Sequence, residues 1–235
     1  MHGGPPDLAV AVRTALRDAA DPARAAGMQA YLKSAQPCLG VRVPAVRRMT
    51  LALAREQPPS SAAEVRDVAT TLWRGAAHRE ERYAAVALTG LPVARGSLVL
   101  LSLYQEVIVT GAWWDHVDGV APRVRDLLLA SPATMTMLLR GWARSPDRWL
   151  RRSAVIAQLG AKARTDTALL TEVIEVNAAD PEFFVRKAIG WALRDYARTD
   201  PGWVRRFLTE HELSPLSRRE AAKHLSGVPA AGRPG

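Results

Sequence analysis

Apolar residues recur along most of this chain at intervals of three or four, the spacing that one buried face of an α-helix requires. One such stripe comprises Leu98, Leu101, Leu103, Tyr104 and Val107. No segment alternates apolar and polar residues convincingly, as a half-buried strand does, and no Asn-Gly or Asp-Gly pair joins two such segments as a hairpin turn. The pattern therefore predicts an all-α protein.

Recurrent pairs of a capping residue and a proline mark where the predicted helices begin. Serine or aspartate caps the first N–H groups of a helix, and proline fits the first turn because its missing N–H has no helical partner there. These pairs are Asp21-Pro22, Ser131-Pro132, Ser145-Pro146, Asp180-Pro181, Asp200-Pro201 and Ser214-Pro215. Together with the periodicity they predict helices over about 7–19, 22–35, 44–56, 61–74, 79–90, 97–110, 113–129, 132–143, 147–160, 167–178, 183–197, 202–211 and 217–225.

Four of the helix starts recur roughly every 34–35 residues, which corresponds to one helix pair per repeat. These starts are Ser97, Ser131, Asp166 and Asp200. Short loops between helices favour antiparallel neighbours, so the repeat predicts an α-solenoid whose stacked pairs curve around a concave face. We expect a single domain over residues 7–225, a disordered N-terminus over 1–6 and a flexible, Gly/Pro/Ala-rich tail over 226–235.

The net charge of the chain indicates a class of partner but does not identify it. The 235 residues include 32 Lys and Arg against 23 acids, a net charge of +9, which favours an anionic partner such as nucleic acid or a membrane surface. The excess of arginine over lysine suits phosphate recognition, but it equally fits a GC-rich genome. Cys38 is the sole cysteine, which excludes an internal disulfide and a cysteine-based metal site. Without a long apolar run or a signal peptide, we expect a cytoplasmic protein with no membrane-spanning helix. We also expect no metal and no cofactor.

Candidate chemistry concentrates in the stretch from Gly111 to Val120, which holds two tryptophans and two aspartates. In a helix, Trp114 and Asp118 are four residues apart and share one face. Pro122 removes the helical N–H donor for the carbonyl of Asp118, so the helix is predicted to kink or end near this acid. A carboxylate beside an aromatic face suits a positively charged centre. The alternative is an ordinary helix start with acids in its first turn and tryptophans in the core.

Basic and aromatic residues share helical faces in the second half of the chain, at spacings of three, four or seven. The sets are Arg148 with Arg152, Lys187 with Trp191 and Arg194, and Arg219 with Lys223. A single solvated helix face carries such residues too, but three helices that repeat this pattern favour a groove for a polyanion.

Four segments closely resemble the AlkD family of bacterial DNA alkylation-repair glycosylases, which are built from HEAT-like repeats. They are Val109-Thr-Gly-Ala-Trp-Trp-Asp-His-Val-Asp118, Arg148-Trp-Leu-Arg-Arg-Ser-Ala154, Phe183-Phe-Val-Arg-Lys-Ala-Ile-Gly-Trp-Ala-Leu-Arg-Asp-Tyr-Ala197 and Leu213-Ser-Pro-Leu-Ser-Arg-Arg-Glu-Ala221. The resemblance extends over about residues 7–225 and implies a right-handed solenoid with a concave DNA-binding groove.

The resemblance also implies residue roles. It makes Asp118 the catalytic acid, Trp114 and Trp191 the sugar-contacting tryptophans, and Arg152 an active-site arginine that holds the phosphate beside the lesion. The DNA-binding candidates are Tyr31 near the lesion strand, Arg42 where the family often has glutamine, Arg47, Arg148, Lys187, Arg194 and Arg219, with Arg186 as a further phosphate contact.

The implied activity is hydrolysis of the N-glycosidic bond of cationic N3- or N7-alkylated purines in double-stranded DNA, bulky adducts included, by a monomeric, monofunctional glycosylase. Of the two kinds of anionic partner we expect DNA and no membrane. A cationic base leaves without protonation, so the paired carboxylates of ordinary glycosidases are unnecessary. Two alternatives stay open from the residues alone: a non-catalytic DNA-structure binder and a protein-binding scaffold of HEAT repeats.

Overall fold

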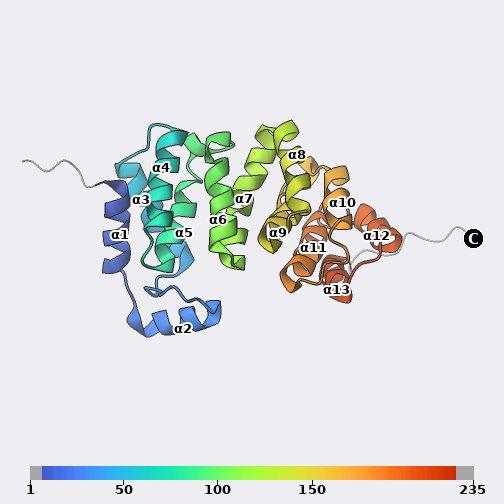
Figure 1. Cartoon of the computed structure of the whole chain (residues 1–235), viewed down its shortest axis with the longest axis horizontal. Coiled ribbons are helices and arrows are strands. Elements are labelled where there is room, and N and C mark those ends of the chain that lie inside the picture. The colour runs from blue at the N-terminus through green and yellow to red at the C-terminus, as the bar shows by residue number, and fades with distance from the viewer. Residues whose placement is uncertain (1–6, 226–235) are drawn as a thin grey trace, which may run out of the picture. The chain divides into compact units, whose positions relative to one another are not determined.

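A computed structural model describes residues 7–225. The segments 1–6 and 226–235, predicted to be disordered and flexible, lie outside the described residues. Figure 1 shows a chain of helices joined by short connections. Between residues 7 and 225 the structure contains thirteen α-helices and no strand, so the predicted all-α fold is confirmed.

Each of the thirteen predicted helices corresponds to an observed one, with ends that differ by a few residues. The α-helices are α1 Leu8–Asp18, α2 Pro22–Leu32, α3 Val43–Glu56, α4 Ala62–Arg74, α5 Arg79–Leu88, α6 Leu101–Gly111, α7 Trp114–Ala130, α8 Pro132–Ala143, α9 Arg148–Ile156, α10 Thr167–Glu175, α11 Phe183–Tyr196, α12 Pro201–Glu210 and α13 Pro215–Ala221. Four 3₁₀ turns accompany them: η1 Pro92–Ala94, η2 Leu98–Leu100, η3 Lys162–Arg164 and η4 Ala222–His224.

The capping pairs predict most helix starts correctly and two incorrectly. Asp21, Asp200 and Ser214 are N-caps whose side chains accept backbone N–H groups, each with proline next. Ser145-Pro146 and Asp180-Pro181 are not helix starts. Asp147 caps α9 instead, and α11 begins at Phe183 after Glu182. In both cases the predicted cap, Ser145 or Asp180, accepts the backbone N–H two residues later, so it forms the turn before the helix.

Helix α7 continues through Pro122 to Ala130, in agreement with the predicted range 113–129, so of the two alternatives predicted near Asp118 an end of the helix is ruled out. Proline costs a helix one hydrogen bond and crowds the preceding turn. Burial offsets this cost, because Val117, Val120, Val124 and Leu127 follow helical spacing across the proline and all are buried.

Within the described residues the chain divides into two compact units, one up to Gly111 and one from Ala112 onwards. In the first unit α5 packs against α1, α3 and α4. Its buried Glu80 accepts the backbone N–H groups of Leu39, Gly40 and Val41, which fixes the segment that leads into α3. The carboxylate replaces water for three buried donors that no helix or strand satisfies.

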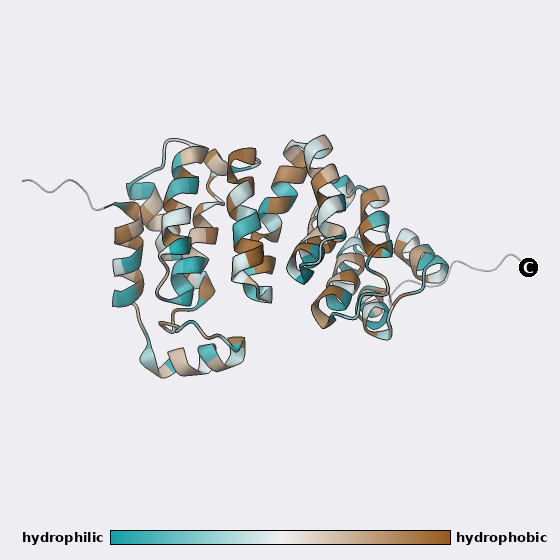
Figure 2. Cartoon of the chain, viewed as in Figure 1, coloured by the Kyte–Doolittle hydropathy of each residue, from teal (hydrophilic) through white to brown (hydrophobic). Residues whose placement is uncertain are grey.

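In the second unit α9 is the central helix and packs against α7, α8, α10 and α11, while α13 covers α11. Figure 2 shows the apolar and polar sides of individual helices as brown and teal stripes. The aliphatic core includes Val117, Val155, Ile156, Ile174 and Ile189, which are fully buried. Two predictions concern both units together: a solenoid with one concave face, and a single domain over residues 7–225. Both stay predictions, because each unit is described by itself.

Candidate active site

The candidate acid is held by the predicted arginine. Asp118 lies on α7, and Arg152 lies on the neighbouring α9. The Nε of Arg152 donates to Oδ1 of Asp118 and Nη2 donates to Oδ2, both at 2.8 Å. This two-point contact matches the planar guanidinium to the planar carboxylate and fixes both side chains.

Arg152 is anchored on its remaining side as well. Its Nη1 donates to the carbonyl of Phe184 on α11, and only 4% of its side chain is exposed. All three guanidinium nitrogens therefore have partners inside this unit. The geometry favours a role in positioning Asp118 over the phosphate contact that the resemblance implies for Arg152.

Burial and the arginine act on Asp118 in opposite directions. Removal from water raises the pKa of the Asp118 carboxyl above its ordinary value of 3.8, and the nearby charge of Asp115 raises it further. The hydrogen bonds and positive charge of Arg152 lower it and offset part of this rise. Arg152 thus helps a buried carboxylate to stay ionised, while 19% of the Asp118 side chain remains exposed to solvent or ligand.

The two candidate tryptophans come from different helices. Trp114 is the first residue of α7, one turn before Asp118, and the helical backbone confirms that they share a face. Trp191 lies on α11, with its ring centroid 5.9 Å from Cζ of Arg152. Arg152 therefore contacts the carboxylate on one side and an aromatic ring on the other. Both tryptophans are half-buried.

An aromatic cluster that the sequence analysis did not identify supports this arrangement. The rings of Trp113, Trp149 and Phe184 lie with centroids 5.1–6.0 Å apart, in tilted and edge-on contacts. They join the start of α7 to α9 and α11. Because Phe184 also supplies the carbonyl that binds Arg152, this packing positions the ion pair. The repeat length of the sequence could have predicted the ion pair itself. Asp118 and Arg152 are 34 residues apart, which is one repeat, so they occupy equivalent positions in neighbouring repeats.

The basic candidates of the second unit differ in what surrounds them. Arg148 is exposed, bonds Glu182 at 3.2 Å and lies over the ring of Trp149. Lys187 and Arg194 both approach the buried carboxylate of Glu220. Arg219 is exposed on α13. Arg186 lines an open hollow and has a buried Nε with no hydrogen-bond partner.

The remaining candidates belong to the first unit. Tyr31 on α2 is 74% exposed, Arg42 is the N-cap of α3, and Arg47 is exposed one turn into that helix. Each of these side chains is therefore accessible to a ligand on its own unit. Their part in DNA binding stays a prediction.

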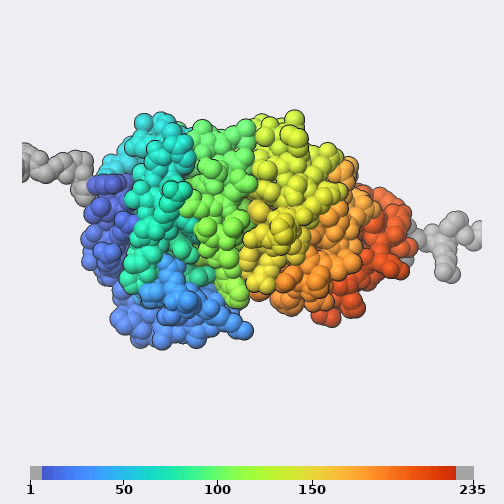
Figure 3. Space-filling model, viewed as in Figure 1, coloured from blue at the N-terminus to red at the C-terminus, as the bar shows by residue number. Residues whose placement is uncertain are grey.

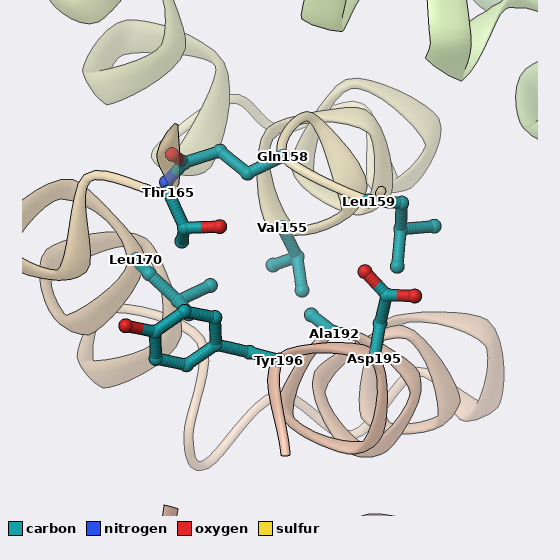
Figure 4. Close-up of a pocket in the computed structure, with 8 residues that line it drawn as sticks. All are labelled: Val155, Gln158, Leu159, Thr165, Leu170, Ala192, Asp195 and Tyr196. Atoms are coloured by element: carbon teal, nitrogen blue, oxygen red, sulfur yellow. The ribbon is translucent and has the colours of Figure 1, made fainter. Parts of the chain in front are cut away.

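A small cavity in the second unit lies apart from these groups. Its volume is about 10 Å³, and Val155, Leu170, Ala192 and Tyr196 are among the residues around it in Figure 4. That is space for about one water molecule and far too little for a purine. Neither Asp118 nor either candidate tryptophan lines it.

The fold and the site together define a class of protein: a basic, all-helical chain with a buried carboxylate–arginine pair beside half-exposed tryptophans. The profile of the family described as DNA alkylation repair enzyme matches residues 12–225. The chain belongs to this family. A solved structure titled a predicted DNA alkylation repair enzyme from Enterococcus faecalis is similar to it, with 29% sequence identity and a TM-score of 0.71. The match covers 89% of this chain and 98% of the other.

None of the curated proteins compared with the chain matches it. Within residues 7–225, every helix is too short or too polar to cross a membrane.

Proposed function

We propose that this protein is a DNA glycosylase that hydrolyses the N-glycosidic bond of N3- or N7-alkylated purines in duplex DNA and leaves an abasic site. Membership of a DNA alkylation repair family supports DNA as the partner. The observation that carries the proposal is the two-point bond between Asp118 and the buried Arg152, next to Trp191 and one turn from Trp114. This arrangement presents a fixed negative charge and aromatic faces, which suit a cationic sugar.

The chemistry needs little more than this. The C1′–N bond breaks and its electron pair goes to the base, which is already cationic and therefore leaves neutral. The deoxyribose becomes oxocarbenium-like, and a water molecule adds to C1′ and gives its proton to the Asp118 carboxylate. Arg152 occupies one direction on each carboxylate oxygen, which leaves other lone pairs for the sugar and the water.

The size of the electrostatic effect is sufficient to matter. One carboxylate about 4 Å from a cation contributes roughly 4 kcal/mol at an effective dielectric of about 20, before the opposing charge of Arg152 is considered. An effect of this order changes a rate by about a thousandfold. Each tryptophan face adds about 1–2 kcal/mol if it is desolvated against the sugar. The site acts through charge and orientation, and we assign no residue to protonate the base.

The charge of the leaving base should determine which lesions the protein releases. Duplexes that carry N7-methylguanine or a bulky cationic N3-alkyladenine should lose the modified base, because the charge of the leaving group is what matters. Uracil and 1,N6-ethenoadenine should be poor substrates, since a neutral base leaves as an anion unless an acid protonates it. The measurement is single-turnover release of each base from matched duplexes, corrected for release without protein.

Three outcomes of that assay have different meanings. Release of cationic bases supports the proposal, binding without release indicates a DNA-structure binder, and neither activity indicates a scaffold for other proteins. Efficient release of uracil, or a steep loss of activity with adduct size, would contradict the proposal and indicate a pocket that encloses the base.

The raised pKa of Asp118 predicts the pH dependence. The ionised carboxylate is the active form, so excision should fall as pH decreases through the raised pKa of Asp118. The acid limb of the pH–rate profile, where the rate falls as the solution becomes more acidic, should therefore lie above the pH at which an ordinary aspartate with a pKa of 3.8 is half-ionised. The test is the single-turnover rate between about pH 4 and 8, with spontaneous release subtracted at each pH. A rate that stays constant over this whole range would contradict the assignment of Asp118.

A further inference from the structure

One buried carboxylate on the last α-helix gathers three cations from two elements. Glu220 on α13 is only 5% exposed. Its Oε1 accepts from Nζ of Lys223 at 2.7 Å and lies 3.9 Å from Nζ of Lys187, while its Oε2 accepts from Nη1 of Arg194 at 2.9 Å. We call these four residues the Glu220 cluster. It has three positive charges against one negative charge, so it is strongly basic.

The packing of α13 on α11 fixes the cluster in place. A Cβ atom added at Gly190 would meet Cβ of Glu220 at 2.4 Å and the carbonyl of Ser217 at 2.7 Å, so only glycine permits this close approach. The buried Ser217 hydroxyl also donates to the carbonyl of Arg186 on α11. Figure 3 shows the orange surface of α11 adjoining the red surface of α13 on one face.

The cations remain accessible although the carboxylate is not. The side chains of Lys187 and Lys223 are 46% and 49% exposed, whereas that of Glu220 is 7% exposed. Both ammonium groups approach the same oxygen, Oε1, so they lie within the span of one phosphate group. On α11, Lys187 and Arg194 are on the same face as Trp191, because the three are four and three residues apart.

We propose that the Glu220 cluster is a preorganised binding site for a single backbone phosphate of duplex DNA, with Lys187 and Lys223 as its direct contacts and Glu220 as the residue that holds them together. The inference rests on the proposed function in taking DNA as the ligand. Lys223 and Glu220 thereby join the candidate DNA-binding residues. The phosphate contact that they form is distinct from the ion pair of Asp118 and Arg152.

Salt dependence of duplex binding tests this inference without any need for excision. We would measure the affinity of the full chain for undamaged duplex between about 50 and 200 mM salt. The variants are Lys187→Gln, Lys223→Gln, the double variant, and Arg206→Gln as a control at an exposed position on α12. If both lysines neutralise one phosphate, the double variant loses about 0.9 from the slope of log K against log salt. Two separate phosphates would give about 1.8, and no loss would show that the cluster only closes α13 on α11. Either result overturns the proposal.

Glu220→Gln gives an independent test, because the preorganised site and simple net charge predict opposite signs. The substitution adds one positive charge to the chain, so non-specific attraction alone would raise duplex affinity. In the preorganised site the lysines lose the group that holds them together, and affinity falls severalfold. An increase in affinity would overturn the proposal, provided that thermal unfolding shows the variant to be folded. If the wild-type chain binds duplex but excises nothing, the proposed function fails while these binding tests still decide the inference.

Discussion

Asp118→Asn is expected to lower the single-turnover rate of excision by about 10²- to 10³-fold, the usual effect of removing one preorganised electrostatic group. The substitution removes the negative charge beside the developing cation and changes the side-chain volume very little. Asparagine keeps one oxygen that can accept from Arg152, so the helices should remain packed. The rate should be measured at saturating DNA, which separates the chemical step from binding.

Two observations are needed beside that rate. Duplex affinity should change little, because the partly buried Asp118 lies in an ion pair and a carboxylate is not a ligand for an anionic phosphate. Asp126→Asn, on the same helix and paired with Arg125, should leave excision within about twofold. The residual rate of Asp118→Asn should also lose the acid limb. Near-normal turnover by a folded Asp118→Asn protein would end the role proposed for this acid.

Arg152→Gln is expected to lower excision at neutral pH and to shift the acid limb upward. Without the guanidinium, burial dominates and the pKa of Asp118 rises further, so the carboxyl is protonated over more of the pH range. Removing one partner of a buried ion pair typically costs about 3–5 kcal/mol of stability, although protonation of the acid relieves part of this cost. The measurements are the pH–rate profile, urea unfolding and the salt slope of duplex binding.

Arg148→Gln is the matched comparison, since Arg148 lies one turn earlier on the same helix but is exposed. It should reduce the salt slope if it contacts a phosphate, and it should leave the acid limb in place. Arg152→Gln should show the opposite pattern, and Arg152→Lys should restore only part of the rate because lysine lacks the planar fork. A reduced salt slope in Arg152→Gln with an unchanged pH profile would return Arg152 to the phosphate-binding role.

The helices and the location of the chemistry could be predicted from sequence because local interactions determine them. Capping aspartates and the 3.6-residue apolar period depend on neighbours within one or two turns, so thirteen helices were placed correctly. The same logic correctly placed Trp114 and Asp118 on one helical face. It left open whether the helix ends or only kinks near Pro122, where burial of Val120 and Val124 offsets the local cost of proline in α7. Capping and apolar periodicity do not show how deeply these valines are buried, so they cannot predict that burial.

Only the tertiary structure decided what each charged side chain does. Arg148 and Arg152 stand one turn apart on α9, and their spacing alone groups them as basic residues of a polyanion site. Packing of α9 against α7 and α11 buries Arg152 against Asp118 and the carbonyl of Phe184, while Arg148 stays at the surface. In the same way Glu220 joins Lys187 to Lys223, which come from different elements. These pairings depend on which residues distant in sequence meet, and on how much water their contact removes, and a single sequence specifies neither.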